Sequence, residues 1–368
     1  MIGRHRSELD TPALCIDLDV MAANIRAMSS FLAAQGKNWR PHIKGNKTPE
    51  IAQQMIEAGA IGVTSAKTTE AEVFMHAGIT DILIANQIIG EQKLQRVVEM
   101  CQLGTPVVAI DHFVQAEALS DLCRQANVKC RVLVDIDVGM NRAGIRPGPD
   151  AFQLAQGVDS LSHVELVGIM GYEGHLVRVE DQTKKEFQIR NAMSLLEELR
   201  DRMLAGGMCC DIVSAGGTGT YQITATCPAI TELQCGGGIF GDPFYQEQCQ
   251  VAGLEEAIQL IATVTSRPCL ERGVLDIGRK TTGVQYHPLK VTTTVEGRRL
   301  PDVQVMQSSA EHTTLKLGSD SQSLVIGDRV VVVPGYMDMT TMLHERFYGL
   351  RNDIVEQVWE IAARGKLQ

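Results

Sequence analysis

The chain has 368 residues and a net charge of −10, and 44% of its residues are hydrophobic whereas only 4% are aromatic. This acidic balance, with no basic run that could neutralise a row of phosphates, argues against a nucleic-acid partner. No apolar stretch approaches the roughly 20 residues that span a bilayer, and the charged start lacks the apolar segment of a secretion signal, so we expect a cytoplasmic protein. Its ten scattered cysteines form no CxxC pair and are expected to be reduced thiols.

Short β-branched runs alternate with longer amphipathic stretches over the first two thirds of the chain. Strands are expected at 39–44, 60–64, 80–85, 106–110, 130–136, 165–170, 211–214 and 231–235. Helical patterns lie between most of them, for example Val20–Gln35, Pro49–Ala58, Thr68–Ala77, Gln115–Gln125 and Gln182–Met203. Eight strands with helical crossovers predict an α/β fold, a parallel (β/α)8 barrel.

After about Pro268 the helical periodicity fades, and strand-like alternation takes over in HPLKVTTTVEG, TTLKLG and LVIGDRVVVVPGY. This pattern predicts an antiparallel β domain of roughly 100 residues. The run PALCIDLD at 12–19 precedes the barrel, with which it is free to pair, but we count it with the β domain. The expected domains are therefore a barrel at 20–255 and a β domain at 256–368 together with 1–19.

Lys44 lies at the end of the first expected barrel strand, in RPHIKGNKTPEIA. In such barrels the C-terminal ends of the strands form the active face. A lysine in apolar surroundings there has its ammonium form disfavoured, which is the condition for a nucleophilic amine that forms a Schiff base. On spacing alone, Lys44 fits a surface lysine whose stem lines the barrel rim somewhat better than it fits a Schiff-base lysine.

Two glycine-rich segments follow the last two expected barrel strands, SAGGTGTY at 214–221 and CGGGIFGD at 235–242. The loops in this position are the usual phosphate site of such barrels, and Thr218 and Thr220 add hydroxyl donors. Each run alone also fits a tight turn between a strand and a helix. Together they predict a ligand that carries a phosphate, although neither matches a Walker loop or a dinucleotide fingerprint.

Charged and aromatic residues follow strands five and six. DIDVGMNRAGI places Arg142 on the active face, where it either binds an oxyanion or forms an ordinary ion pair with Asp135 or Asp137. MGYEGH brings Tyr172 and His175 close together. His175 fits equally well as an acid or base and as a satisfied polar residue.

PHIKGNK, followed by GAIGVTSAKTTEAEVF and ITDILIANQ, resembles the D-threonine aldolase and D-serine dehydratase family. The likeness continues in order through VGMNRAGI, VSAGGTGTY, ELQCGGG, VLDIGRK and LHERFYGLRNDIVEQVWEIAARGK, so it covers nearly the whole chain. Members are pyridoxal-phosphate (PLP) enzymes of fold type III, the alanine-racemase fold, in which a barrel precedes a β domain. The resemblance also implies a homodimer with its active site near the subunit junction and a small amino-acid substrate.

The resemblance implies a role for each matching residue. Lys44 would carry PLP as a Schiff base, Arg142 would contact the phenolic side of the cofactor, and Tyr172 would lie beside its ring. The residues that would bind the phosphate are Gly216, Gly217, Thr218, Gly236 and Gly237. Gln234 would face the pyridine nitrogen, where a neutral amide would not enforce protonation.

Family members commonly bind a divalent metal such as Mg²⁺, Mn²⁺ or Zn²⁺ near the substrate hydroxyl, through a histidine and a cysteine or aspartate two residues later. Here the segment reads PGYMDMTT, so Tyr336 replaces the histidine and Asp338 is the one remaining metal candidate. A neutral phenol is a poor ligand for a divalent ion, so the sequence does not predict a complete metal site. Glu173 and Asn46 also stand where members often have a histidine, which indicates a rebuilt pocket.

These observations favour a PLP-dependent lyase that splits a D-β-hydroxy amino acid into glycine and an aldehyde by retro-aldol cleavage. His175, Tyr336 or a metal-bound water would be the base for the β-hydroxyl. In a dehydratase, Lys44 would instead remove the Cα proton to give a keto acid and ammonia, and a racemase would need a second base. Two other classes of protein fit less well. A non-catalytic PLP-binding barrel would lack the β domain. A barrel enzyme that acts on a phosphorylated sugar without PLP would leave the Lys44 motif unexplained.

Overall fold

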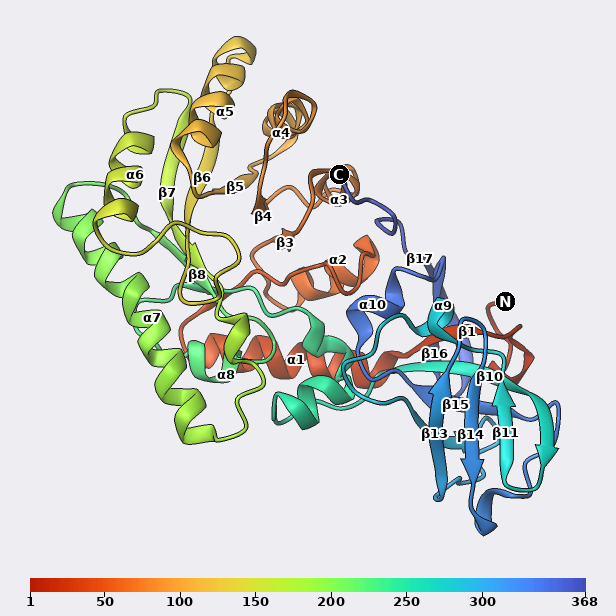
Figure 1. Ribbon diagram of the computed structural model, residues 1–368. Coiled ribbons are helices and arrows are strands. Elements are labelled where there is room, and N and C mark those ends of the chain that lie inside the picture. The colour runs from red at the N-terminus through yellow and green to blue at the C-terminus, as the bar shows by residue number, and fades with distance from the viewer.

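The computed structural model describes residues 1–368 and contains two sheets, one of eight parallel strands and one of nine mostly antiparallel strands (Figure 1). The strands of the first sheet are β2 (Asn38–Trp39), β3 (Val63–Ser65), β4 (Ile82–Gln87), β5 (Val107–Ile110), β6 (Cys130–Ile136), β7 (Val164–Gly171), β8 (Ile212–Ala215) and β9 (Glu232–Leu233). The helices between and around them are α1 (Leu18–Ala34), α2 (Pro49–Glu57), α3 (Thr68–His76), α4 (Glu91–Leu103), α5 (Phe113–Ala126), α6 (Pro149–Asp159), α7 (Gln182–Ala205) and α8 (Tyr221–Thr224).

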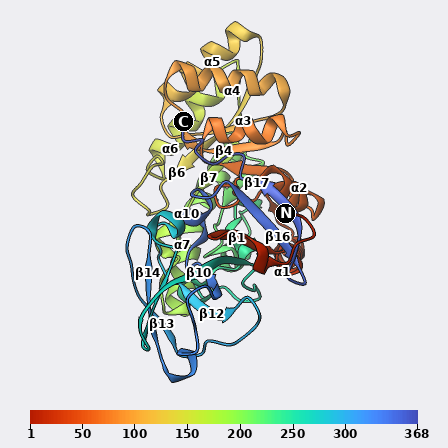
Figure 2. The same cartoon turned by 90° about the vertical axis from the view of Figure 1, so that its right-hand side faces the viewer.

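The eight parallel strands form the expected barrel. Their order is β2-β9-β8-β7-β6-β5-β4-β3, and parallel bridges from Trp39 to Ala60 and from His42 to Thr64 join the two ends. The helices lie around the outside, as Figures 1 and 2 show from two directions. A small apolar cluster that includes Leu83, Val107 and Leu133 is contributed by the barrel strands themselves. The prediction of an α/β barrel is therefore confirmed.

The first barrel strand is shorter than the sequence predicts. It covers Asn38–Trp39 rather than 39–44, although the backbone N–H groups of Arg40 and His42 still donate to β9 and the residue that follows it. Pro41 has no N–H to continue the ladder, and the chain then enters a turn. Lys44 consequently lies in this turn and not at the end of a strand.

The second sheet combines the start of the chain with its last third. Its strands are β1 (Ala13–Asp17), β10 (Ile258–Cys269), β11 (Arg272–Leu275), β12 (Lys290–Thr294), β13 (Val303–Ser308), β14 (Thr313–Leu317), β15 (Arg329–Val333), β16 (Arg346–Arg351) and β17 (Ile354–Glu360). β1 lies between β10, to which it is antiparallel, and β16, to which it is parallel. The run 12–19 therefore pairs with the β domain and not with the barrel. The division at residue 256 stays a prediction, which this pairing supports.

The two sheets share one apolar core. A cluster of 86 buried residues includes Trp39 and Ile43 of the barrel as well as Leu260 and Phe347 of the second sheet. The short helices α9 (Arg279–Thr282) and α10 (Met337–Thr341) belong to the C-terminal part, and α10 packs toward the barrel (Figure 1). All ten cysteines are free thiols. None of the helices combines the length and the apolar character needed to cross a membrane.

Candidate active site

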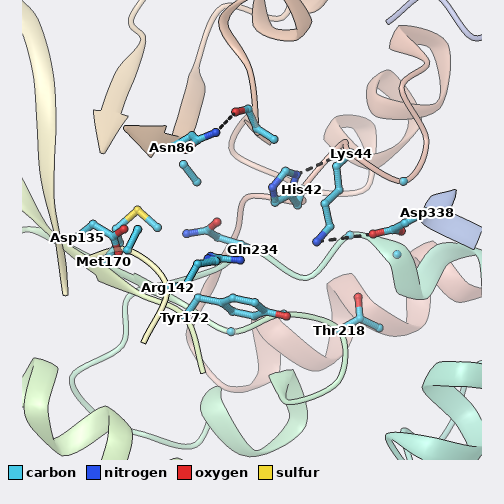
Figure 3. Close-up of a pocket in the computed structure, with 18 of the residues that line it drawn as sticks. His42, Lys44, Asn86, Asp135, Arg142, Met170, Tyr172, Thr218, Gln234 and Asp338 are labelled. Atoms are coloured by element: carbon cyan, nitrogen blue, oxygen red, sulfur yellow. Dashed lines mark hydrogen bonds and ion pairs between the residues drawn. The ribbon is translucent and has the colours of Figure 1, made fainter. Parts of the chain in front are cut away.

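A cavity of about 330 Å³ opens at the C-terminal edge of the barrel strands (Figure 3). This volume lies within the range of roughly 300–1,000 Å³ that is usual for small-molecule sites. The residues of the sequence prediction that line it are Lys44, Arg142, Tyr172, Gly216, Gly217, Thr218, Gln234, Gly236, Gly237 and Asp338. The structure thus brings all the predicted cofactor-binding residues together with the predicted metal candidate.

Lys44 projects into the cavity, and its side chain exposes 44% of its surface. Its Nζ lies 3.6 Å from Oδ2 of Asp338, a residue from the other sheet's domain. Burial alone would lower the pKa of Lys44, but the Asp338 carboxylate more than offsets this effect and raises the pKa above its usual value. The sequence-based expectation of a disfavoured ammonium form was therefore wrong, because it omitted this carboxylate.

A buried carboxylate holds the first glycine-rich loop, which follows β8, and a threonine of this loop joins it to the second loop after β9. Glu173 accepts hydrogen bonds from the hydroxyls of Thr220 at 2.6 Å and Thr224 at 2.5 Å, and from the Gly216 N–H at 3.3 Å. The Thr218 hydroxyl accepts from the Gly238 N–H at 3.1 Å, which ties the two loops together. Glu173, which replaces a histidine common in the family, therefore supports the loop and does not line the cavity.

The second loop approaches the segment that follows β2 too closely for a side chain. A Cβ atom at Gly236 would lie 2.1 Å from the backbone oxygen of His42, and one at Gly237 would lie 2.9 Å from the Tyr245 ring. At Gly236 and Gly237, therefore, no side chain covers the loop backbone that lines the cavity. Such a cradle fits a phosphate group.

Arg142 and Tyr172 stack at one wall of the cavity. The Arg142 guanidinium lies 5.6 Å from the centroid of the Tyr172 ring, and it forms no ion pair with Asp135 or Asp137. Burial raises the pKa of Tyr172, so the phenol is neutral. Beside them Gln234 donates from Nε2 to the Ser214 hydroxyl at 3.0 Å. Arg142 is thus available for an oxyanion in the cavity.

Three other residues of the sequence prediction lie outside the lining. His175 is exposed and does not border the cavity, so the structure does not bring it to the site. Tyr336 stands behind Asp338 and donates from its hydroxyl to Oδ2 at 2.9 Å. Asn46 is buried under the Lys44 turn, where its Oδ1 accepts from the Thr48 N–H at 3.1 Å and its Nδ2 has no partner.

Several residues of the cavity were missed by the sequence analysis. The His42 ring accepts from the Lys44 N–H at 3.2 Å, and burial lowers the pKa of His42 well below its usual value, so the ring is neutral. Gln87 donates to Oδ2 of Asp135 at 2.8 Å, and burial raises the pKa of Asp135 to about 6. His42, Gln87 and Asp135 could have been found from the sequence, because they lie at or near the ends of expected strands. Tyr245 carried no such signal, because it comes from the segment after the second loop.

The residues around Asp338 do not fit a divalent metal. The structure contains no group of three or more His, Cys, Asp or Glu side chains that could hold an ion. Asp242, the neighbouring buried carboxyl, accepts from the backbone N–H groups of Met337 at 3.0 Å and Tyr245 at 3.2 Å. Burial also raises the pKa of Asp242 to about 8. One carboxylate and one neutral phenol are too few donors for the ions considered.

A comparison with models of protein families matches residues 16–243 to the alanine racemase N-terminal domain. The chain belongs to this family. Residues 257–350 match a second model, described as a putative serine dehydratase domain. The two matches lie on the barrel and on the second sheet of this alanine-racemase-like protein.

Full-length relatives of this family member are aldolases and dehydratases. The chain is 31% identical to the D-threonine aldolase of Arthrobacter sp. over 99% of its own length and 95% of that protein. It is 29% identical to the 3-hydroxy-D-aspartate aldolase of Paracoccus denitrificans, with 99% and 94% covered. The D-threo-3-hydroxyaspartate dehydratase of Delftia sp. is 25% identical, with 96% and 97% covered. The crystal structure of D-threonine aldolase from Filomicrobium marinum superposes with a TM-score of 0.94 at 29% identity, covering 100% of this chain and 99% of that one.

Proposed function

We propose that this protein is a PLP-dependent lyase that cleaves a D-β-hydroxy amino acid to glycine and an aldehyde. The observation that carries the proposal is the convergence of the Lys44 amine, two glycine-rich loops and the Asp338 carboxylate on one cavity of about 330 Å³. The full-length similarity to two aldolases of D-β-hydroxy amino acids supports the substrate class.

The cavity residues fit PLP. Lys44 would hold the cofactor through its amine, the loops at Gly216–Thr218 and Gly236–Gly237 would bind its phosphate, and Gln234 would face its ring nitrogen. When bound, PLP supplies an electron sink for the charge that is left on Cα when a bond to that atom breaks.

The protein's own groups determine which bond breaks. Arg142, free of any carboxylate partner, is suited to bind an anionic oxygen, and the stacked Tyr172 ring limits its movement. Asp338 lies on the Lys44 side of the cavity and is the carboxylate closest to the amine. A substrate attached near Lys44 would therefore meet Asp338 with its β-hydroxyl. Removal of that proton favours cleavage between Cα and Cβ.

The experiment is turnover of D- and L-threonine and D-3-hydroxyaspartate by the purified holoenzyme, with glycine, aldehyde, keto acid and ammonia measured in parallel. We expect glycine and aldehyde in equal amounts from the D-isomers only. The Lys44→Ala variant should lose the visible absorption of bound PLP together with turnover, and borohydride should fix the cofactor to the peptide that contains Lys44. A keto acid with ammonia would instead identify a dehydratase.

Three further predictions belong with this function, namely a homodimer, a cytoplasmic location and the domain boundary at residue 256. The second family model begins at residue 257, which supports the proposed boundary. Light scattering of the purified holoenzyme should give twice the mass of one 40.1 kDa chain. A mass of a single chain would contradict the proposed dimer.

A further inference from the structure

The segment that contains Tyr336 and Asp338 builds a fixed carboxylate at the edge of the cavity. The Tyr336 hydroxyl donates to Oδ2 of Asp338 at 2.9 Å, and the same oxygen lies 3.6 Å from Nζ of Lys44. Only 9% of the Asp338 side chain is exposed. Oδ2 of Asp338 therefore contacts the Tyr336 hydroxyl and also faces the Lys44 amine, and Figure 3 shows the carboxylate and the amine turned toward each other.

Gly45 makes this approach possible. A Cβ atom at this position would lie 2.6 Å from Oδ1 of Asp338, which is closer than such atoms come in proteins. A side chain at residue 45 would therefore displace the Asp338 carboxylate from its present position. Gly45 and Tyr336 are positioning residues that act on opposite oxygens of the same carboxylate.

The surroundings of Tyr336 are aromatic. The Tyr336 ring packs against Phe244 and Tyr286, with ring centroids 5.0 and 4.9 Å away. Both oxygens of Asp242, the next carboxyl along, are occupied by backbone N–H groups. A divalent ion at Asp338 would thus find one carboxylate and a phenol already engaged with it, whereas such ions require several oxygen or nitrogen ligands.

Resting on the proposed function, we propose that this chain cleaves its substrate without a divalent metal, and that the Asp338 carboxylate accepts the proton of the substrate β-hydroxyl. The proton moves from the β-oxygen to an Asp338 oxygen, and the electron pair of the O–H bond becomes the second bond of the aldehyde carbonyl. The Cα–Cβ bond breaks, its electron pair stays on Cα, and a proton later added to Cα gives glycine. Tyr336 holds the carboxylate in line for this transfer.

Metal binding tests the first half of the proposal. Holoenzyme dialysed against EDTA should contain less than about 0.1 metal ion per chain and should show no saturable heat on titration with MnCl₂ or ZnCl₂. The variant Tyr336→His adds an imidazole two residues before Asp338, so its affinity for either ion should rise at least about ten-fold. One tightly bound ion per wild-type chain, or activity that EDTA removes and Mn²⁺ restores, would overturn the proposal.

Point variants test the second half. Asp338→Asn should lower kcat for D-threonine by about 10²–10³-fold, within the range of general-base catalysis, while the absorption of bound PLP stays unchanged. Tyr336→Phe should lower kcat by about ten-fold with little change in KM, because the carboxylate remains but is less well held. Tyr286→Phe is the matched control, since it removes a phenol from the same aromatic group without touching Asp338, and it should leave kcat unchanged.

The outcomes separate this inference from the function on which it rests. If Asp338→Asn retains wild-type kcat, Asp338 is not the base and the proposed role is wrong, whereas the lyase activity stands. If the wild type cleaves no β-hydroxy amino acid, the proposed function and the proton transfer fall together. The metal titrations of the wild type and Tyr336→His still decide whether the Tyr336–Asp338 pair excludes a metal site.

Discussion

Asp135 and Asp338 are two carboxyl groups on the same cavity with different surroundings. Asp338 faces the Lys44 amine, whereas Asp135 is half-buried near Arg142 without an ion pair, and its carboxylate accepts one hydrogen bond, from Gln87. Burial is the largest cause of the raised pKa of Asp135, which is about 6. The charged form of Asp135 therefore lowers the stability of the folded protein at neutral pH.

This loss of stability depends on pH in a defined way. Because the folded-state pKa of Asp135 exceeds its usual value of 3.8, the native state binds more protons than the unfolded state between these values, and stability falls as pH rises through this window. Asp135→Asn keeps an oxygen for Gln87 and removes the charge. Its free energy of unfolding relative to wild type should therefore improve by about 1 kcal/mol between pH 5 and pH 8.

Urea unfolding of the holoenzyme at both pH values, followed by circular dichroism, measures this difference. The same relative stability of Asp135→Asn at pH 5 and pH 8 would show that the wild-type carboxyl titrates near its usual value. The reverse trend, an improvement at acidic pH, would mean that Asp135 is paired with a cation.

At this scale the sequence predicted residues that belong to linear motifs and missed those that depend on packing. Lys44 stands in the recognisable run PHIKGNK and Gly236 in ELQCGGG. The support of the loop by Glu173 was not predictable, because its partners Thr220 and Thr224 lie 47 and 51 residues away along the chain. The exposed place of His175 was not predictable either, since its local pattern fits an acid or base and a satisfied polar residue equally well.

At the scale of elements, the second glycine-rich loop depends on how closely it approaches the segment that follows β2. A side chain at Gly236 would meet the backbone of His42, which is less able to move than a side chain. Gly236→Ala should therefore lower the free energy of unfolding by about 1–3 kcal/mol and weaken PLP binding, because the loop must shift. Spectrophotometric titration with PLP and urea unfolding measure both effects.

Gly273→Ala is the matched control for this prediction. Its Cβ would have no neighbour closer than 3.7 Å, so stability should change by less than about 0.5 kcal/mol and PLP binding should be unchanged. An equal effect of the two substitutions would show that the loss at Gly236 comes from glycine replacement in general and not from the contact with His42.

Element prediction was accurate where periodicity was strong and failed where tertiary pairing decides. The run 130–136 was predicted with the bounds that β6 has in the structure. The run 39–44 looked like one strand, but Pro41 interrupts its ladder and only two residues remain in β2. The partners of β1 could not be read from the sequence, because they are strands more than 240 residues away.

At the scale of the whole molecule, the cavity takes Lys44 from the barrel and Asp338 from the C-terminal part. One apolar core of 86 residues continues through both parts. Neither part can therefore lose its packing without exposing apolar residues of the other part. We expect the molecule to unfold in one cooperative step.

The two tryptophans test this expectation, because Trp39 lies in β2 and Trp359 in β17. The variants Trp359→Phe and Trp39→Phe each leave one reporter, and fluorescence of each should give a transition that coincides with that of its own circular dichroism and PLP absorption. Separate midpoints for the fluorescence of one reporter and the circular dichroism of the same variant would show that the two parts unfold independently.

The central place of β1 has a consequence for synthesis of the chain. Residues 13–17 leave the ribosome early, yet one of their two neighbours, β16, ends only at Arg351. At about 5–20 residues per second, this mostly apolar strand waits for roughly 20–70 seconds before its second edge can be covered. The barrel is completed in the meantime, so α1 can be in place while the strand directly before it is still half paired. Until β16 has been made, we therefore expect one edge of the apolar strand β1 to stay exposed on the nascent chain.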